Sequence, residues 1–173
     1  MIPALLALAV ATAPQAPATP PAVEGDPVER RRSEVARDLI RVGEELRREI
    51  VAGDARALAA RVPADGLRCA GRLVPRARVQ RDLSTTGSWL HDTLLGAPGV
   101  EGSRAAPASV AELLRVHGEV AIAISFVRDP RAEPLGRPCL EFRAKDVVGP
   151  TAPLCFERRD GRWWFTESLY PCG

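Results

Sequence analysis

Glu167 is the residue of this chain whose surroundings best suit proton transfer. Segment 162–170 alternates apolar and polar residues, which predicts a strand. On that strand Trp163, Phe165, Glu167 and Leu169 share one face, so the carboxyl group has apolar neighbours. If this face lines a cavity, desolvation raises the pKa of Glu167 and permits general acid–base catalysis. The alternative, which the sequence favours, is that this end of the strand frays to solvent or that Glu167 pairs with one of the many arginines.

His91 is the second candidate for proton transfer, because histidine titrates near neutral pH. It precedes Asp92 in a predicted helix, and adjacent helical residues point apart. We therefore expect these two side chains not to form a dyad. The other histidine, His117, lies at a predicted helix end, where the helix dipole favours a cation. The two histidines do not have the spacing of metal ligands, so we predict no metal site and no cofactor.

Residues 61–81 form a basic segment in which six arginines accompany a single acidic residue, Asp65. Guanidinium groups suit carboxylate and phosphate, and the expected partner is an envelope protein or an anionic surface. The alternative is a solvated face, which the chain's net charge of only +2 favours. Aromatic residues do not interleave with the arginines, so no nucleic-acid partner is expected. The candidate binding residues are Arg68, Arg72, Arg76, Arg78 and Arg81, together with Trp164, which can face away from Trp163 as an exposed contact.

The N-terminal 18 residues predict a secretory signal peptide. An apolar run at 2–10 is followed by the small-residue site Ala16–Ala18, which places cleavage before Thr19. The run is shorter than the ~20 residues that span a bilayer, so we expect no transmembrane segment. Residues 19–25 form a Pro-rich tether, and residues 26–173 form one domain. The predicted location is exported, either periplasmic or secreted, with a bacterial envelope as the expected setting.

Four cysteines in an exported chain predict two disulfides in an oxidising compartment. Strand register leaves their pairing open. If Phe142 lies beside Phe156, the second and third cysteines are offset by four residues, about 13 Å, which is beyond disulfide reach. A longer turn aligns them but puts Pro150 and Pro153 inside a strand, which suits only an edge. The cysteines are Cys69, Cys139, Cys155 and Cys172.

The helical patterns come first in the chain and the strand patterns last. Asp26 and Pro27 give a helix start, and an apolar stripe continues to Gly53. Asp160-Gly161 is a hairpin signal between the last two strands. The prediction is an α+β domain in which a long N-terminal helix and short helices precede a four-stranded antiparallel meander. Short helices are expected at 55–62, 75–83, 89–95 and 109–117, a short strand within 66–74, and longer strands at 119–127, 139–148, 154–158 and 162–170.

The long helix, the segment GDARAL that opens a short helix, and a final GRWWFTESLY together resemble the NTF2-like or cystatin-like superfamily. The resemblance covers most of residues 27–170, and the extra helical segments at 75–117 depart from it. It implies a curved sheet that wraps the long helix around a conical cavity. It also places the Cys69 strand near the last strand, which implies Cys69–Cys172 and hence Cys139–Cys155. Members include enzymes, transport adaptors and exported proteins, so the resemblance implies an architecture rather than one activity.

The function that these patterns favour is a non-enzymatic exported binding or interaction domain. The alternative is a small cavity-bearing NTF2-like enzyme or ligand-binding protein that uses Glu167 and His91. A cavity that contains Glu167 would favour the alternative, and a packed core there would remove it.

The export prediction has a direct test. Edman sequencing of material recovered from the exported fraction should begin at or near Thr19, because the A-x-A site precedes it. Recovery of the chain from the cytosol with Met1 intact would contradict the prediction.

Overall fold

The computed structural model describes residues 26–69, 71–96, 109–145, 147 and 153–170. The predicted signal peptide and tether, and with them Cys172, lie outside the described residues. The α+β fold class is confirmed: a long N-terminal helix and short helices are followed by a four-stranded antiparallel sheet.

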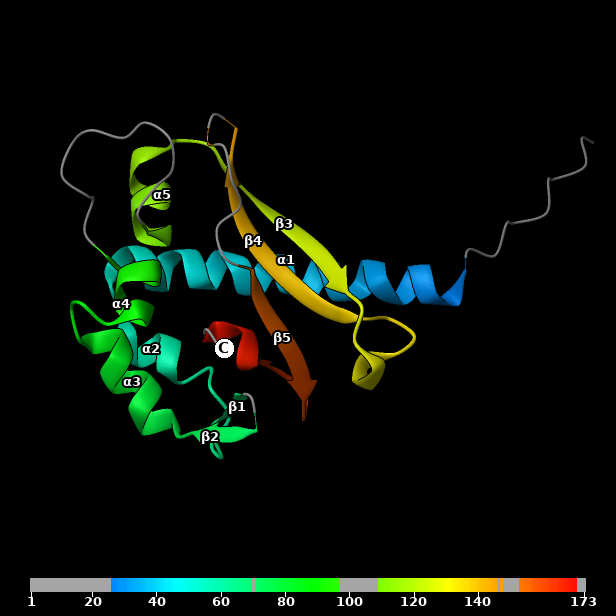
Figure 1. The fold of residues 1–173 in the computed structure, drawn as a ribbon. Coiled ribbons are helices and arrows are strands. Elements are labelled where there is room, and N and C mark those ends of the chain that lie inside the picture. Colours follow the sequence, from blue (N-terminus) through cyan, green and yellow to red (C-terminus); the bar gives the residue numbers. More distant parts are fainter. Residues whose placement is uncertain (1–25, 70, 97–108, 146, 148–152, 171–173) are drawn as a thin grey trace, which may run out of the picture.

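Helix α1 (Pro27–Ala52) begins and ends where the sequence predicts. The Asp26 carboxylate accepts a hydrogen bond from the Val28 N–H at 2.9 Å, and Gly53 ends the helix with φ 66°. At 1.5 Å per residue the helix is about 39 Å long. Its first three turns contribute no buried residue and extend past the sheet (Figure 1). The buried residues lie in the second half of the helix: Leu39, Val42, Gly43, Leu46 and Ile50.

The short helices gather around the C-terminal end of α1 (Figure 1). Three of them begin at predicted polar caps, where the side chains of Asp54, Ser88 and Ser109 each accept a backbone N–H. Together with α1 they enclose one end of the hydrophobic core. These helices are α2 (Ala55–Ala59), α3 (Arg76–Ser84), α4 (Trp89–Leu94) and α5 (Val110–Val116).

The main sheet is a meander with strand order β3-β4-β5-β6. The second half of α1 packs closely against it at Gly43, where a Cβ atom would come within 2.7 Å of Leu140 Cδ1 and 2.8 Å of Ile122 Cδ1. The strands are β3 (Val120–Val127), β4 (Arg137–Ala144), β5 (Leu154–Arg159) and β6 (Arg162–Phe165).

Two strand predictions need correction. The segment 66–74 forms two strands rather than one, β1 (Leu67–Cys69) and β2 (Arg72–Val74), which pair as a separate hairpin. The last strand stops at Phe165 instead of continuing to Tyr170. The chain then turns into a 3-10 helix, η2 (Glu167–Leu169), and the Tyr170 hydroxyl donates to Asp82 Oδ2 on α3 at 2.6 Å. This contact holds the end of the chain against α3, away from the line of the strand.

The disulfide Cys139–Cys155 joins β4 to β5. The two strands share two residue pairs, and one of them is Cys139 opposite Cys155. The register with Phe142 beside Phe156 is therefore wrong, because Leu140 already lies opposite Leu154, the first residue of β5. Strand β5 begins after Pro153, so this proline does not interrupt the pairing. The second predicted bridge involves Cys172, which lies outside the described residues.

Within the described part of the chain, no helix is both long enough and apolar enough to cross a membrane.

Candidate functional site

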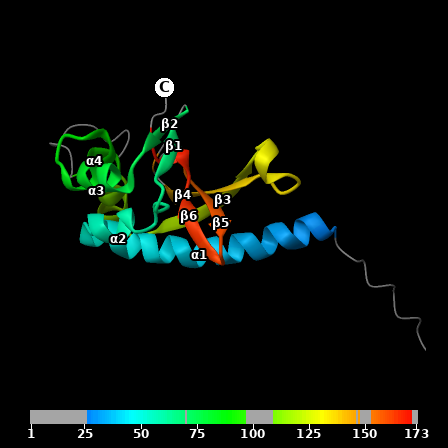
Figure 2. The same cartoon turned by 90° about the horizontal axis from the view of Figure 1, so that it is seen from below.

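A cavity of about 580 Å³ lies between the projecting half of α1 and the sheet. Figure 2 shows the elements around it: α1 runs past the strands, and the β3–β4 connection lies beyond the same end of the sheet. That connection, residues 128–136, contains a 3-10 helix, η1 (Pro130–Ala132). The remaining walls come from residues 63–68, from β5 and β6, and from the start of η2.

Four aromatic residues lie on the inner side of the cavity, in a lining that also contains many charged residues. The rings of Phe156 and Phe165 stack at 5.1 Å between centroids, and both residues are fully buried. Trp163 and Phe126 are half-buried and also line the space. Because Phe156 and Phe165 are fully buried, Trp163 and Phe126 are the aromatic residues that present surface to the cavity, and covering that surface favours an apolar group.

Two contacts connect α1 across the cavity to the opposite walls. Arg32 Nε donates to the Leu135 carbonyl oxygen at 3.2 Å, and its guanidinium lies 5.5 Å from the centroid of the Phe126 ring. Asp38 accepts an ion pair from Arg158 of β5 at 3.4 Å. The projecting half of α1 is thus held to the β3–β4 connection and to the sheet, although it contributes no buried residue.

Arg137 is the central charged group of the site. It forms an ion pair with Glu167 at 2.7 Å and a second one with Asp129. Its side chain is 20% exposed. Burial alone would lower the pKa of Arg137, but hydrogen bonds to the two carboxylates raise it overall. All three groups line the cavity. Asp129 lies in the β3–β4 connection and Glu167 lies in η2, so Arg137 joins these two segments.

Glu167 lines the cavity, as the cavity hypothesis required, but its pKa shifts in the opposite direction. Burial acts to raise the pKa of Glu167, and the hydrogen bond from Arg137 outweighs it and lowers the pKa. Glu167 lies in η2, so the strand face on which the prediction was built does not extend to it. At neutral pH the carboxylate is ionised and paired, which suits a positioning group better than a proton donor.

Sequence reasoning missed the two residues that complete this cluster with Glu167, namely Asp129 and Arg137. Asp129 has a local signal, since it precedes Pro130 and its carboxylate accepts the N–H of Arg131 at 2.9 Å as an N-cap. The hydrogen bond from Arg131 lowers the pKa of Asp129. Burial opposes this change, and the pairing with Arg137 adds to it. Arg137 has no comparable signal, because 30 positions separate it from Glu167 and only the folded chain brings them together.

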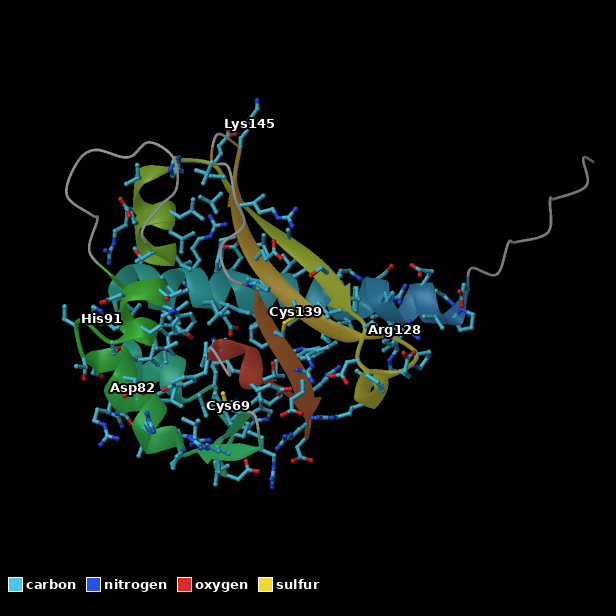
Figure 3. All side chains as sticks on the ribbon, in the orientation of Figure 1. Cys69, Asp82, His91, Arg128, Cys139 and Lys145 are labelled. Carbon is cyan, nitrogen blue, oxygen red and sulfur yellow. A yellow bond between two sulfur atoms is a disulfide. The ribbon has the colours of Figure 1, made fainter. Side chains whose placement is uncertain are left out.

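His91 lies on α4, remote from the cavity. Figure 3 places it at the far side of the helical region, away from β4, and it does not line the site. The expectation that the side chains of His91 and Asp92 would point apart was wrong, because His91 Nδ1 lies 3.0 Å from Asp92 Oδ1. The Asp92 carboxylate also accepts the Gly87 N–H at 3.0 Å, which turns it back along the helix. Hydrogen bonds from His91 and Gly87 lower the pKa of Asp92.

The basic segment 61–81 divides between different environments. Arg61 is paired with Glu49 at 2.6 Å and with Glu45 at 2.9 Å, so it belongs to the packing of α1. Burial alone would lower the pKa of Arg61, but hydrogen bonds to these two carboxylates raise it. Arg68 lines the cavity, and Arg78 lies 3.6 Å from Asp82.

Trp164 differs from the expected exposed contact. It is half-buried, with the guanidinium of Arg76 at 5.8 Å and that of Arg162 at 4.4 Å from its ring. The described residues contain no group of three or more acidic, cysteine or histidine side chains that could hold a metal ion.

Comparison with known proteins gives no further guide to the site. No family model matches the chain, and neither a curated protein nor a solved structure matches it.

Replacing Arg137 by methionine tests the central ion pairs. We expect the free energy of unfolding at pH 7 to fall by about 1 kcal/mol, because Glu167 loses a charged hydrogen bond at a partly exposed position. Pairing holds the pKa of Glu167 below its ordinary value of 4.5. Its stabilisation is therefore present above about pH 4.5 and is lost as the pH falls through the lowered pKa. Urea unfolding from pH 3 to 7 should show the two proteins converging at low pH.

The matched control is Arg143→Met on the same strand, which breaks the more exposed pair with Glu141. It should cost less than about 0.5 kcal/mol at every pH. Identical pH profiles for the two variants would contradict a special role for Arg137.

Proposed function

We propose that this chain is an exported, non-enzymatic domain that binds a small organic molecule in the cavity between α1 and the sheet. One observation supports this most strongly. The lining of the cavity of about 580 Å³ combines aromatic side chains with charged groups that are fixed by ion pairs, and ligand sites of ~300–1,000 Å³ commonly combine apolar surface with placed polar groups.

Binding accounts for the polar groups better than catalysis does. Glu167 and Asp129 are engaged by Arg137, and His91, the other candidate for proton transfer, lies outside the cavity. Charged groups that already have partners can orient a ligand through their remaining hydrogen-bonding capacity. A general acid–base needs a group whose pKa lies near the working pH, and the pKa of Glu167 moves away from that range.

The rim carries charges of both signs. Arg31, Arg131, Glu34 and Glu133 line the cavity, and all four are exposed. The ligand that fits best therefore has an apolar part in contact with Trp163 and Phe126 and polar groups that meet the charged residues of the rim. The position of the cavity, between a long helix and a sheet, supports the proposal of NTF2-like architecture that the sequence resemblance implies.

Export is part of the proposal. The Cys139–Cys155 disulfide supports an oxidising compartment, and it agrees with the signal peptide that residues 1–18 predict.

Filling the cavity tests the proposed function. N-Phenyl-1-naphthylamine, a neutral apolar dye that fluoresces out of water, should bind the wild-type chain at one saturable site. Ala132 of η1 lines the cavity, and Ala132→Trp should weaken the dye about tenfold or more, because the indole occupies the same space. Fluorescence titration measures both affinities.

Ala77→Trp is the matched control, since Ala77 lies on the exposed side of α3 outside the cavity. It should bind the dye as the wild type does. Absence of saturable binding to the wild type, or equal affinity in the two tryptophan variants, would contradict the proposal.

A further inference from the structure

Unneutralised positive charge gathers on the surface formed by the β1–β2 hairpin, helix α3 and β6. Among the described residues, the arginines there have no carboxylate oxygen within 4.0 Å. Figure 3 shows side chains with nitrogen atoms gathered around β1, β2 and α3. The arginine surface consists of Arg68, Arg72, Arg76, Arg81 and Arg162.

Trp164 connects the parts of the arginine surface. Its ring lies near the guanidinium groups of both Arg76 and Arg162, at 5.8 and 4.4 Å. Strand β2 leads through Pro75 directly into α3, so the hairpin and Arg76 are close along the chain. Arg162 also donates to the Ala60 carbonyl oxygen at 3.0 Å, which fixes it in place.

Nearby acidic residues do little to offset this charge, because most of them are already paired. Asp82 lies 3.6 Å from Arg78, and Arg159 reaches Glu157 at 2.5 Å and Asp65 at 3.9 Å. None of these contacts uses an arginine of the arginine surface. The chain as a whole carries a net charge of only +2, so the unpaired arginines here give this surface a positive potential that the whole chain lacks.

An apolar side chain projects from the same hairpin. Leu73 is 55% exposed. It lies opposite Arg68 in the β1–β2 register, and Arg72, opposite Cys69, lies on the other face of the hairpin. Directly opposed residues in an antiparallel pair lie on one face, so the leucine stands beside Arg68. The hairpin lies on the side of the molecule away from α1, free of that helix (Figure 2).

We propose that the arginine surface and Leu73 dock the domain on an anionic lipid bilayer. Guanidinium groups contact lipid phosphates, and each basic residue near such a surface adds about a fivefold gain in partitioning. Leu73 enters the boundary between headgroups and acyl chains, where apolar side chains are stabilised. An acidic protein offers phosphate-like charge as well, but gives no role to a single leucine flanked by arginines. The proposal does not require a ligand in the cavity, although Arg68 belongs to both sites.

Vesicle sedimentation tests the proposal, with every variant made in the same full chain. The wild type should bind vesicles of 30% phosphatidylglycerol in phosphatidylcholine at least tenfold more tightly than vesicles of phosphatidylcholine alone. The preference should fall in 0.5 M NaCl, because salt screens exposed charges. Arg68→Gln with Arg72→Gln should remove about tenfold or more of the binding to anionic vesicles. Leu73→Ser should weaken binding to them about threefold or more.

Two variants serve as matched controls: Arg48→Gln changes an exposed arginine on α1, and Val116→Ser changes a 64% exposed valine on α5. Both should bind as the wild type does. Equal binding to the two kinds of vesicle would overturn the proposal, as would losses in the controls that match those in the test variants. Soluble dextran sulfate gives a further control. If it binds saturably, competes fully with vesicles and binds Leu73→Ser as tightly as the wild type, the surface recognises a polyanion instead of a bilayer.

Discussion

The packing of α1 against the sheet is the constraint on which the rest of the structure depends. Leu39, Leu46 and Ile50 are fully buried, and each contributes about 1.5–3 kcal/mol by leaving water. Gly43 lets the helix approach Ile122 and Leu140 more closely than any residue with a Cβ atom. This buried stripe occupies only the second half of the helix. The first half must therefore project past the core, and its projection creates one wall of the cavity.

The opposite walls are held together where the sheet is weakest. Strands β4 and β5 share two residue pairs, and the disulfide lies at one of them. The β3–β4 connection beyond this point is fixed by polar contacts: Arg137 joins it to η2, and Arg32 joins it to α1. The walls of the cavity are thus joined by a disulfide on one side and by ion pairs and hydrogen bonds on the other. The charged groups that fix these walls are themselves paired.

The sequence predicted most of the fold because its signals are local. Asp26, Ser88 and Ser109 mark helix starts through bonds within two or three residues, and Asp160-Gly161 marks the last hairpin. The candidate site was harder to predict because its contacts are long-range. The path of the chain at Glu167 depends on Tyr170 reaching Asp82, 88 residues away, and its pKa depends on Arg137. The cysteine register depended on where β5 begins, which alternation of residue types does not specify.

The charged residues divide between two roles. In the cavity, Arg137, Arg158 and Arg159 pair with carboxylates, which favours a ligand body without net charge. On the arginine surface the arginines are unmatched, which favours an anionic partner. The central claim is that the space between α1 and the sheet is a binding site. The most direct test is a methyl NMR titration with N-phenyl-1-naphthylamine. Methyl signals of Val35, Leu67 and Leu135, which line the cavity, should shift together and saturate. Those of the exposed Val51 and Val116 should stay in place. Shifts confined to Val51 and Val116, or no shift at Val35, Leu67 and Leu135, would contradict the claim.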